Sequence, residues 1–198
     1  MRLSSALMGY TLPYRVFQAP FAEKKLAPVR AHNDFSKILC VLDVGCGPGT
    51  NTHHFKSSSH FGVDINEGYL RAACSRHGRR FVVADVTKMP LQGVRFDFIL
   101  VNSLFHHLDT EATRHTLLQL KSLLGEHGHI HILDLVLPER RNIAWQLARL
   151  DRGDYPRPLG EWEELFAQHF EPVVVEPYPV GAFGVTLWNM VYFKGRTR

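Results

Sequence analysis

The chain has 198 residues, of which 45% are hydrophobic and 21% charged, and its formal net charge is +4. This composition is typical of a globular protein and excludes a disordered chain or a fibrous repeat, while the length fits a single domain. The basic residues are scattered, so the charge does not favour a nucleic-acid partner. No apolar run approaches the length of about 20 residues that a transmembrane helix needs, and we expect a cytoplasmic protein.

Residues 1–37 differ from the rest of the chain because aromatic residues and prolines are frequent in them. This composition predicts an extended piece with short helices that packs on the remaining chain. We expect an N-terminal lid or helical segment over 1–37 and a main unit over 38–198, which together form one domain. The oligomeric state stays open, with a homodimer as one alternative.

From residue 38 onward, short apolar runs alternate with helical patterns, which is typical of strands and crossover helices in a parallel sheet. Five strands are predicted in this part, over 38–44, 60–64, 80–84, 96–102 and 129–136. The clearest helix begins after Asp109, a favourable N-cap, and ends at Gly125.

Two more helices are predicted after the fifth strand. Pro138 is expected to open an amphipathic helix that could act as a lid. Ile143, Leu147 and Leu150 share one face of this helix. A further helix contains Trp162.

The chain ends in two predicted strands, over 172–176 and 185–193, joined by a turn-rich stretch at 177–184. The whole pattern predicts an α/β fold with a doubly wound, seven-stranded and mostly parallel sheet. In such a sheet, we expect the chemistry at the carboxyl ends of the strands.

No metal site is predicted. The cysteines lack CxxC spacing and are interpreted as reduced thiols; they are Cys40, Cys46 and Cys74. The pair His53-His54 and the alternating histidines over 127–131 do not supply a tetrahedral ligand shell by themselves.

The most informative motif is the stretch 41–50, VLDVGCGPGT, in which an apolar strand leads into a turn. Its glycines follow a GxGxG pattern: Gly45, Gly47 and Gly49. Small residues let the backbone approach a ligand closely, and Asp43 at the strand end can pair with a cationic ammonium group. A dinucleotide fingerprint would need GxGxxG, but Thr50 takes the last glycine position and Pro48 removes an N–H donor, which argues against NAD or FAD.

Two more acids end the next two strands at equal spacing. Asp64 follows Asp43 by 21 residues, and Asp85 follows Asp64 by 21 residues. Asp64 is placed to accept hydrogen bonds from ribose hydroxyls. Asp85 can accept from the exocyclic amino group of an adenine, with Ile65 and Val86 as apolar walls of the ring.

Three acids at successive strand ends, together with GxGxG, closely resemble the class I S-adenosylmethionine-dependent methyltransferase family over residues 38–136. The resemblance implies a Rossmann-like methyltransferase fold with an antiparallel last strand, S-adenosyl-L-methionine as cofactor and S-adenosyl-L-homocysteine as product. It assigns the methionine part to the glycine loop, the ribose to Asp64 and the adenine to Asp85. The implied cofactor-binding residues are Asp43, Gly45, Cys46, Gly47, Gly49, Asp64, Ile65, Asp85, Val86 and Asn102.

The fourth strand leads into NSLFHHLD at 102–109, which resembles the small-molecule and quinone-type branch of that family. An imidazole there could accept the substrate proton, so His106 and His107 are the candidate catalytic residues, and the sequence does not rank them. The alternative is that one packs at a helix start and the other faces solvent. The Pro-Pro-aromatic pattern of enzymes that methylate DNA bases is absent.

The acceptor is expected to be a small, aromatic or lipid-like molecule that takes the methyl group by in-line displacement. Candidate lining residues, which could equally be packing residues, are Tyr14, Phe17, Gln18, Trp145 and Tyr155. The alternatives are an RNA or protein methyltransferase and a non-catalytic S-adenosylmethionine-binding protein. The sequence leaves open whether oxygen, nitrogen or carbon is methylated.

Overall fold

The computed structural model describes residues 21–78, 80–88, 93–151 and 153–198. Its helices are α2 (Ala22–Ala31), α3 (Glu67–His77), α4 (Thr110–Leu123), α5 (Ile143–Leu150) and α6 (Leu159–Ala167), with the short 3₁₀ helices η2 (Phe35–Lys37), η3 (Thr52–His54) and η4 (Phe105–His107). Its strands are β1 (Cys40–Val44), β2 (Ser59–Asp64), β3 (Arg80–Val83), β4 (Phe96–Asn102), β5 (Leu124–Val136), β6 (Glu171–Ala182) and β7 (Val185–Arg196).

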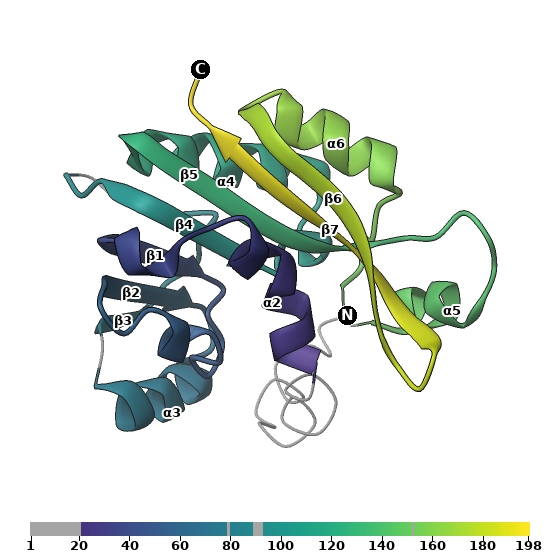
Figure 1. Cartoon of the computed structure of the whole chain (residues 1–198), viewed down its shortest axis with the longest axis horizontal. Coiled ribbons are helices and arrows are strands. Elements are labelled where there is room, and N and C mark those ends of the chain that lie inside the picture. The colour runs from purple at the N-terminus through teal and green to yellow at the C-terminus, as the bar shows by residue number, and fades with distance from the viewer. Residues whose placement is uncertain (1–20, 79, 89–92, 152) are drawn as a thin grey trace.

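The strands form one seven-stranded sheet in the order β3-β2-β1-β4-β5-β7-β6 (Figure 1). The pairs from β3 to β5 are parallel, whereas β7 runs antiparallel to both β5 and β6. The predicted α/β fold with an antiparallel last strand is therefore confirmed. The strand order reverses between β1 and β4, which is the place where ligands bind in open sheets of this kind.

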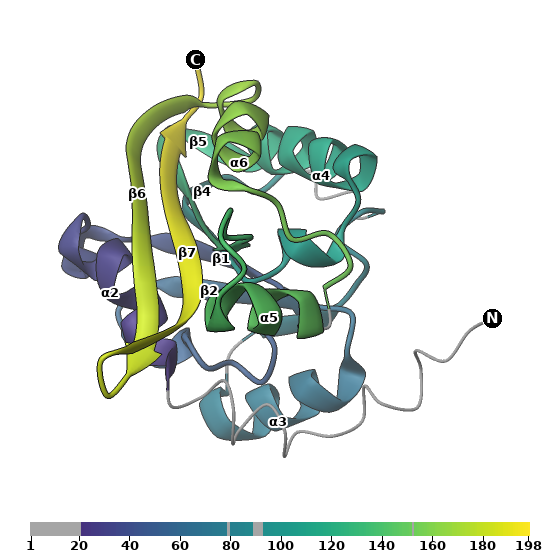
Figure 2. The same ribbon diagram turned by 90° about the vertical axis from the view of Figure 1, so that its right-hand side faces the viewer.

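Alternating residues of the strands divide the core between the two sides of the sheet. Leu42 and Ile99 belong to a cluster with Phe166 of α6, and the same cluster includes the apolar stripe of α4. Val41 and Leu26 belong to a second cluster, in which α2 packs on the opposite face (Figure 2). The sheet is thus covered on both sides, as a doubly wound fold requires.

The N-terminal part of the chain contributes directly to this core. α2 lies within the predicted segment 1–37, and its Leu26 and Val29 are fully buried. The division at residue 37 stays a prediction, and residues 1–20 lie outside the described part of the chain.

Most predicted strand ends lie within two residues of those in the structure, but β5 begins five residues earlier and β6 and β7 end later than predicted. Asp109 caps α4 by accepting a hydrogen bond from Ala112 N at 2.8 Å. α4 ends at Leu123 with Leu124 as its C-cap, so the helix stops just before Gly125 as predicted, and β5 begins directly at Leu124. The predicted turn at 177–184 is confined to Phe183 and Gly184, because β6 continues to Ala182. Its prolines are compatible with a strand because β6 is the edge of the sheet and needs no second partner.

α5 differs from its prediction in where it begins and in which face it buries. Pro138 does not open it; the helix begins at Ile143, after Asn142 accepts a hydrogen bond from Trp145 N at 2.9 Å. The buried residues are Ala144 and Ala148, whose small side chains let the helix lie close to β7. The face with Ile143 and Leu150 is largely exposed.

Within the described ranges, no helix combines the length and the apolar character that crossing a bilayer requires.

Candidate active site

The loop after β1 is held in a conformation that favours glycine. Gly45, Gly47 and Gly49 have φ angles of 69°, 53° and 74°, a region that residues with a Cβ rarely adopt. The backbone N–H groups of Gly45 and Cys46 both donate to Val63 O, at 2.8 and 3.0 Å, so the loop is fixed to the end of β2. The GxGxG motif therefore forms a rigid backbone turn at the point where the strand order reverses.

Cys46 fills space inside this loop. Its side chain is buried, and a Cβ at Gly62 of the neighbouring strand would come within 2.9 Å of its Sγ. Burial, with the nearby charges of Asp43 and Asp64, raises the pKa of the Cys46 thiol far above its usual range. Cys46 is therefore a neutral packing residue and not a nucleophile.

Asp64 at the end of β2 ties the glycine loop to the following helix. One carboxylate oxygen accepts from Gly47 N and the other from Asn66 N, both at 2.8 Å. Burial raises the pKa of Asp64 even though these hydrogen bonds act in the opposite direction. Each oxygen keeps a second lone pair, so the carboxylate can still accept from a ligand hydroxyl.

The side chain of Asp43 is more deeply buried than its predicted role as a ligand-binding acid suggests. Its side chain is fully buried, and within the described residues neither carboxylate oxygen has a hydrogen-bond partner. The nearest ion-pair partner is His60 on β2, whose Nε2 lies 3.7 Å from Asp43 Oδ2. The predicted pairing of Asp43 with a ligand ammonium group stays a prediction.

Asp85 follows β3, the strand next to β2, so the three predicted acids lie at the ends of adjacent strands. Asp85 Oδ1 accepts from the N–H and the hydroxyl of Thr87, at 3.0 and 2.7 Å, and these bonds lower the pKa of the carboxyl. Ile65 is 63% exposed and Val86 is half-buried. The roles of Ile65 and Val86 as apolar walls of an adenine ring stay predictions.

At the carboxyl end of β4, a buried lysine of α2 contacts the residue that follows the strand. Asn102 Oδ1 accepts from the hydroxyl of Ser103 at 3.1 Å, and Lys25 Nζ of α2 donates to the same hydroxyl at 3.3 Å. Burial lowers the pKa of Lys25, while the charges of Asp151 and Asp134 oppose the shift. Sequence reasoning missed Lys25, because nothing in its local pattern distinguishes it from a surface lysine.

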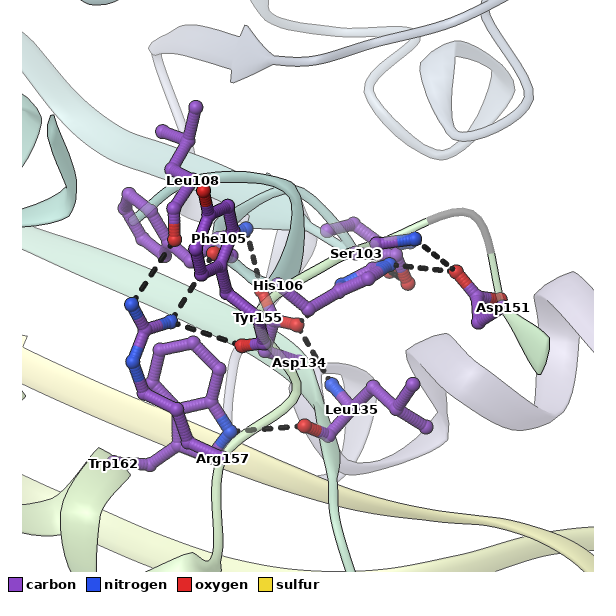
Figure 3. Close-up of polar contacts among 12 residues, drawn as sticks. Ser103, Phe105, His106, Leu108, Asp134, Leu135, Asp151, Tyr155, Arg157 and Trp162 are labelled. Atoms are coloured by element: carbon purple, nitrogen blue, oxygen red, sulfur yellow. Dashed lines mark hydrogen bonds and ion pairs between the residues drawn. The ribbon is translucent and has the colours of Figure 1, made fainter. Parts of the chain in front are cut away.

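His106 lies between two carboxylates (Figure 3). Its Nδ1 is 2.6 Å from Asp134 Oδ1 on β5, and its Nε2 is 3.2 Å from Asp151 Oδ1. Burial alone would lower the pKa of His106, but the charge of Asp134 and the hydrogen bonds to both acids raise it to about 9. Burial would likewise raise the pKa of Asp151, yet the bonds to His106 lower it to about 2.

This geometry distinguishes the two candidate histidines. His106 is buried and uses both ring nitrogens, so it is protonated near neutral pH and poorly suited to accept a substrate proton. His107 is exposed, and its ring centroid lies 4.1 Å from that of His106. Catalytic roles for both residues stay predictions, with His107 the better placed to contact an acceptor.

The segment after α5 closes over η4. Tyr155 N donates to His106 O at 3.0 Å, and a Cβ at Gly153 would collide with the ring and carbonyl of His106. Arg157 donates from its guanidinium to Phe105 O at 3.3 Å and to Leu108 O at 3.0 Å. The linear sequence gave no signal for Asp151 or Arg157, whereas Asp134 resembles the other acids near strand ends.

The predicted acceptor-lining residues are only partly described. Tyr14, Phe17 and Gln18 lie outside the described residues. Trp145 is half-buried, with the guanidinium groups of Arg141 and Arg149 at 5.4 and 5.9 Å from its ring. Tyr155 is 42% exposed beside η4. Their roles in lining an acceptor site stay predictions.

Comparison with known proteins agrees with this arrangement. Residues 41–128 match a family model described as "Methyltransferase domain". An uncharacterized methyltransferase of Mycobacterium bovis is 33% identical over 130 residues, which are 63% of this chain and 65% of that protein, so the match spans slightly less than two thirds of the relative. An O-methyltransferase of Penicillium expansum is 28% identical over 68% of this chain and 46% of its own length.

The fold is also found in solved structures. An N-methyltransferase of Bradyrhizobium japonicum, crystallised with S-adenosyl-L-homocysteine, superposes with a TM-score of 0.75 at 16% identity. The superposition covers 96% of this chain and 94% of that protein.

Proposed function

We propose that this chain belongs to the class I S-adenosylmethionine-dependent methyltransferase family and transfers the methyl group of S-adenosyl-L-methionine to a small-molecule acceptor. The observation that carries the proposal is the rigid glycine loop, bonded to Asp64 at the reversal of the strand order. S-adenosyl-L-methionine is the cofactor of this family, and when bound it supplies a methyl group on a sulfonium leaving group.

The residues present fit this cofactor. Gly49 has no room for a side chain, because a Cβ there would lie 2.9 Å from His77 and 3.2 Å from Ala73. Glycine at this position therefore lets the loop pack directly against α3, and the methionine part would lie along the loop backbone before it. Asp64 would bind the ribose hydroxyls, and Asp85 with Ile65 would bind the adenine.

On the acceptor side, the chain's own task is to position the nucleophile and hold its proton. Methyl transfer from a sulfonium needs an in-line approach, so alignment contributes more than covalent chemistry. Asn102 and His107 lie at the carboxyl end of β4, and His107 would accept a proton from the acceptor. Lys25 Nζ, which donates to the Ser103 hydroxyl beside Asn102, would also donate toward a developing oxyanion.

A compact and partly apolar acceptor fits the surroundings of the carboxyl end of β4. Ile143 and Leu150 of α5 are 56% and 80% exposed, which leaves an apolar strip of that helix uncovered within the described chain. The similarity to an O-methyltransferase of Penicillium expansum supports a hydroxyl acceptor. We therefore place an aromatic or lipid-like alcohol or phenol first among acceptors.

The cofactor half is tested by isothermal titration of the full chain with S-adenosyl-L-methionine and S-adenosyl-L-homocysteine. Asp64→Ala should weaken both by about 1.5–3 kcal/mol, since it removes charge-assisted hydrogen bonds. Glu67→Ala is the matched control, because Glu67 begins α3 nearby but its side chain faces solvent. Absence of binding to the unaltered chain would refute the proposal.

The acceptor half is tested by release of S-adenosyl-L-homocysteine with a panel of phenols, aliphatic alcohols, RNA and proteins. Turnover with small alcohols or phenols supports the proposal. Turnover with RNA or protein alone, or tight cofactor binding with no turnover on any acceptor, would favour one of the two alternative functions.

A further inference from the structure

We propose that His106, His107 and Asp151 form a binding site for one divalent transition-metal cation, with Zn²⁺ the best match. The potential ligand atoms of these three side chains all lie within 4.8 Å of one another. Two ligands come from η4, and the third comes from the chain immediately after α5. Sequence spacing alone predicts no such site, because Asp151 is 45 residues from His106.

The spacing of two of the three ligand atoms matches a tetrahedral ion. Zn²⁺ binds imidazole and carboxylate at about 2.0–2.1 Å, which places neighbouring ligand atoms about 3.3 Å apart. His106 Nε2 and Asp151 Oδ1 are already 3.2 Å apart. His107 is exposed, and a nitrogen of its ring completes the set within 4.8 Å of the other two ligand atoms.

The hydrogen bond that His106 makes through its other ring nitrogen is typical of a metal-binding histidine. Ligating imidazoles generally donate their second ring N–H to a carboxylate, which fixes the ring and makes it a stronger ligand. Here His106 Nδ1 lies 2.6 Å from Asp134 Oδ1. Asp134 is in turn fixed by Phe105 N and Leu135 N, each donating at 2.7 Å.

The ligand set selects the class of ion. Two imidazoles and one carboxylate suit Zn²⁺ and its neighbours, whereas Mg²⁺ and Ca²⁺ prefer sites made of oxygen. Three protein ligands leave the fourth position of a tetrahedron free, as in catalytic zinc sites. On the proposed function, on which this detail rests, the free position would take the oxygen of the acceptor, and in the metal-bound chain the cation would replace His107 as the group that promotes loss of the acceptor's proton.

A second group, Glu23 with His53 and His54, also has ligand atoms close together, but its side chains are more exposed and less firmly held. Glu23 and His53 keep 57% and 50% of their side-chain surface exposed, and His53 Nδ1 contacts the backbone oxygen of Thr50. In contrast, the ring of His106 is 4% exposed and held by a buried carboxylate. The two groups are far enough apart in sequence to be removed separately.

The test is titration of the metal-stripped full chain with ZnCl₂ by calorimetry and with CoCl₂ by visible absorption. We expect one site with the absorption bands of tetrahedral Co²⁺. Asp151→Asn and His107→Ala should each weaken it by more than about 100-fold, beyond the effect of losing an outer-shell partner. The double variant His53→Ala/His54→Ala and the surface variant His115→Ala should leave it unchanged.

Binding that persists in Asp151→Asn and His107→Ala, or that disappears only in His53→Ala/His54→Ala, would overturn the proposal. So would no binding at all, which would mean that a proton alone bridges His106 and Asp151. The readout is independent of methyl transfer: a metal site in a chain that does not bind S-adenosyl-L-methionine would refute the proposed function and leave this site standing.

Discussion

Asp43 and His60 face each other across β1 and β2, with Asp43 Oδ2 3.7 Å from His60 Nε2 and both side chains buried. No other partner for their polar atoms occurs within the described residues. A buried polar pair of this kind depends on both members, because each one compensates the desolvation of the other.

We therefore expect His60→Ala to lower the free energy of unfolding by about 3 kcal/mol, since it leaves the Asp43 carboxyl buried alone. The apolar double variant Asp43→Leu/His60→Phe should be less destabilised than the sum of its single variants. Urea unfolding measures all three, with His115→Ala on the exposed side of α4 as control. A loss below about 0.5 kcal/mol in His60→Ala would show that the pair contributes nothing.

The metal-free chain should lose stability as the pH rises toward 9. The pKa of His106 is raised to about 9 in the folded chain, from an unfolded value near 6.5. Its contribution is therefore fully present below pH 6.5 and is lost as the pH passes through 9; a shift of this size corresponds to about 3 kcal/mol.

Urea midpoints measured between pH 6 and pH 10 in the presence of a chelator test this expectation. His106→Gln should flatten the profile in that window, whereas His115→Gln should follow the unaltered chain. A profile in His106→Gln as steep as in the unaltered chain would mean that another group titrates there.

Gly153 should tolerate no side chain. A Cβ at this position would collide with the ring and the carbonyl of His106, so Gly153→Ala must displace either η4 or the segment after α5. We expect a loss of about 2 kcal/mol or more in unfolding free energy. Gly160→Ala in α6 is the matched control: a Cβ there meets nothing within 4 Å, and alanine should stabilise the helix by up to about 1 kcal/mol.

The local motifs of this chain were predictable because short-range chemistry determines them. GxGxG defines the loop after β1 by its positive φ angles, and Asp109 caps α4 through a bond to a residue three positions away. The acids at the predicted strand ends could be identified from their spacing in the sequence. Parallel pairing of β2 with β3 then brings Asp64 and Asp85 to the same end of the sheet.

The network around His106 could not be predicted in this way. His106 meets Asp134 and Asp151, which are 28 and 45 residues away, and no periodic pattern connects these positions. For α5, the apolar periodicity was correct, but the helix buries its alanines against β7, so tertiary packing selected a different face.

Arg157 offers the last prediction, because it fixes η4 by both polar and aromatic contacts. Its guanidinium donates to the carbonyls of Phe105 and Leu108 and lies 4.6 Å from the ring centroid of Trp162. Lysine keeps the charge but cannot span two carbonyls with a planar fork. We expect Arg157→Lys to lower the unfolding free energy by about 1–3 kcal/mol, since a buried carbonyl then loses its donor.

Arg149→Lys is the control, since Arg149 is exposed on α5 and contacts only the face of Trp145 among the interactions described for it. Hydrogen exchange gives the more specific readout. If Arg157 fixes η4, the amides of His107 and Leu108 should exchange faster in Arg157→Lys, while those of α4 beyond its first turn keep their protection. Equal protection of η4 in both variants would place the stabilising role of Arg157 in its contact with Trp162 alone.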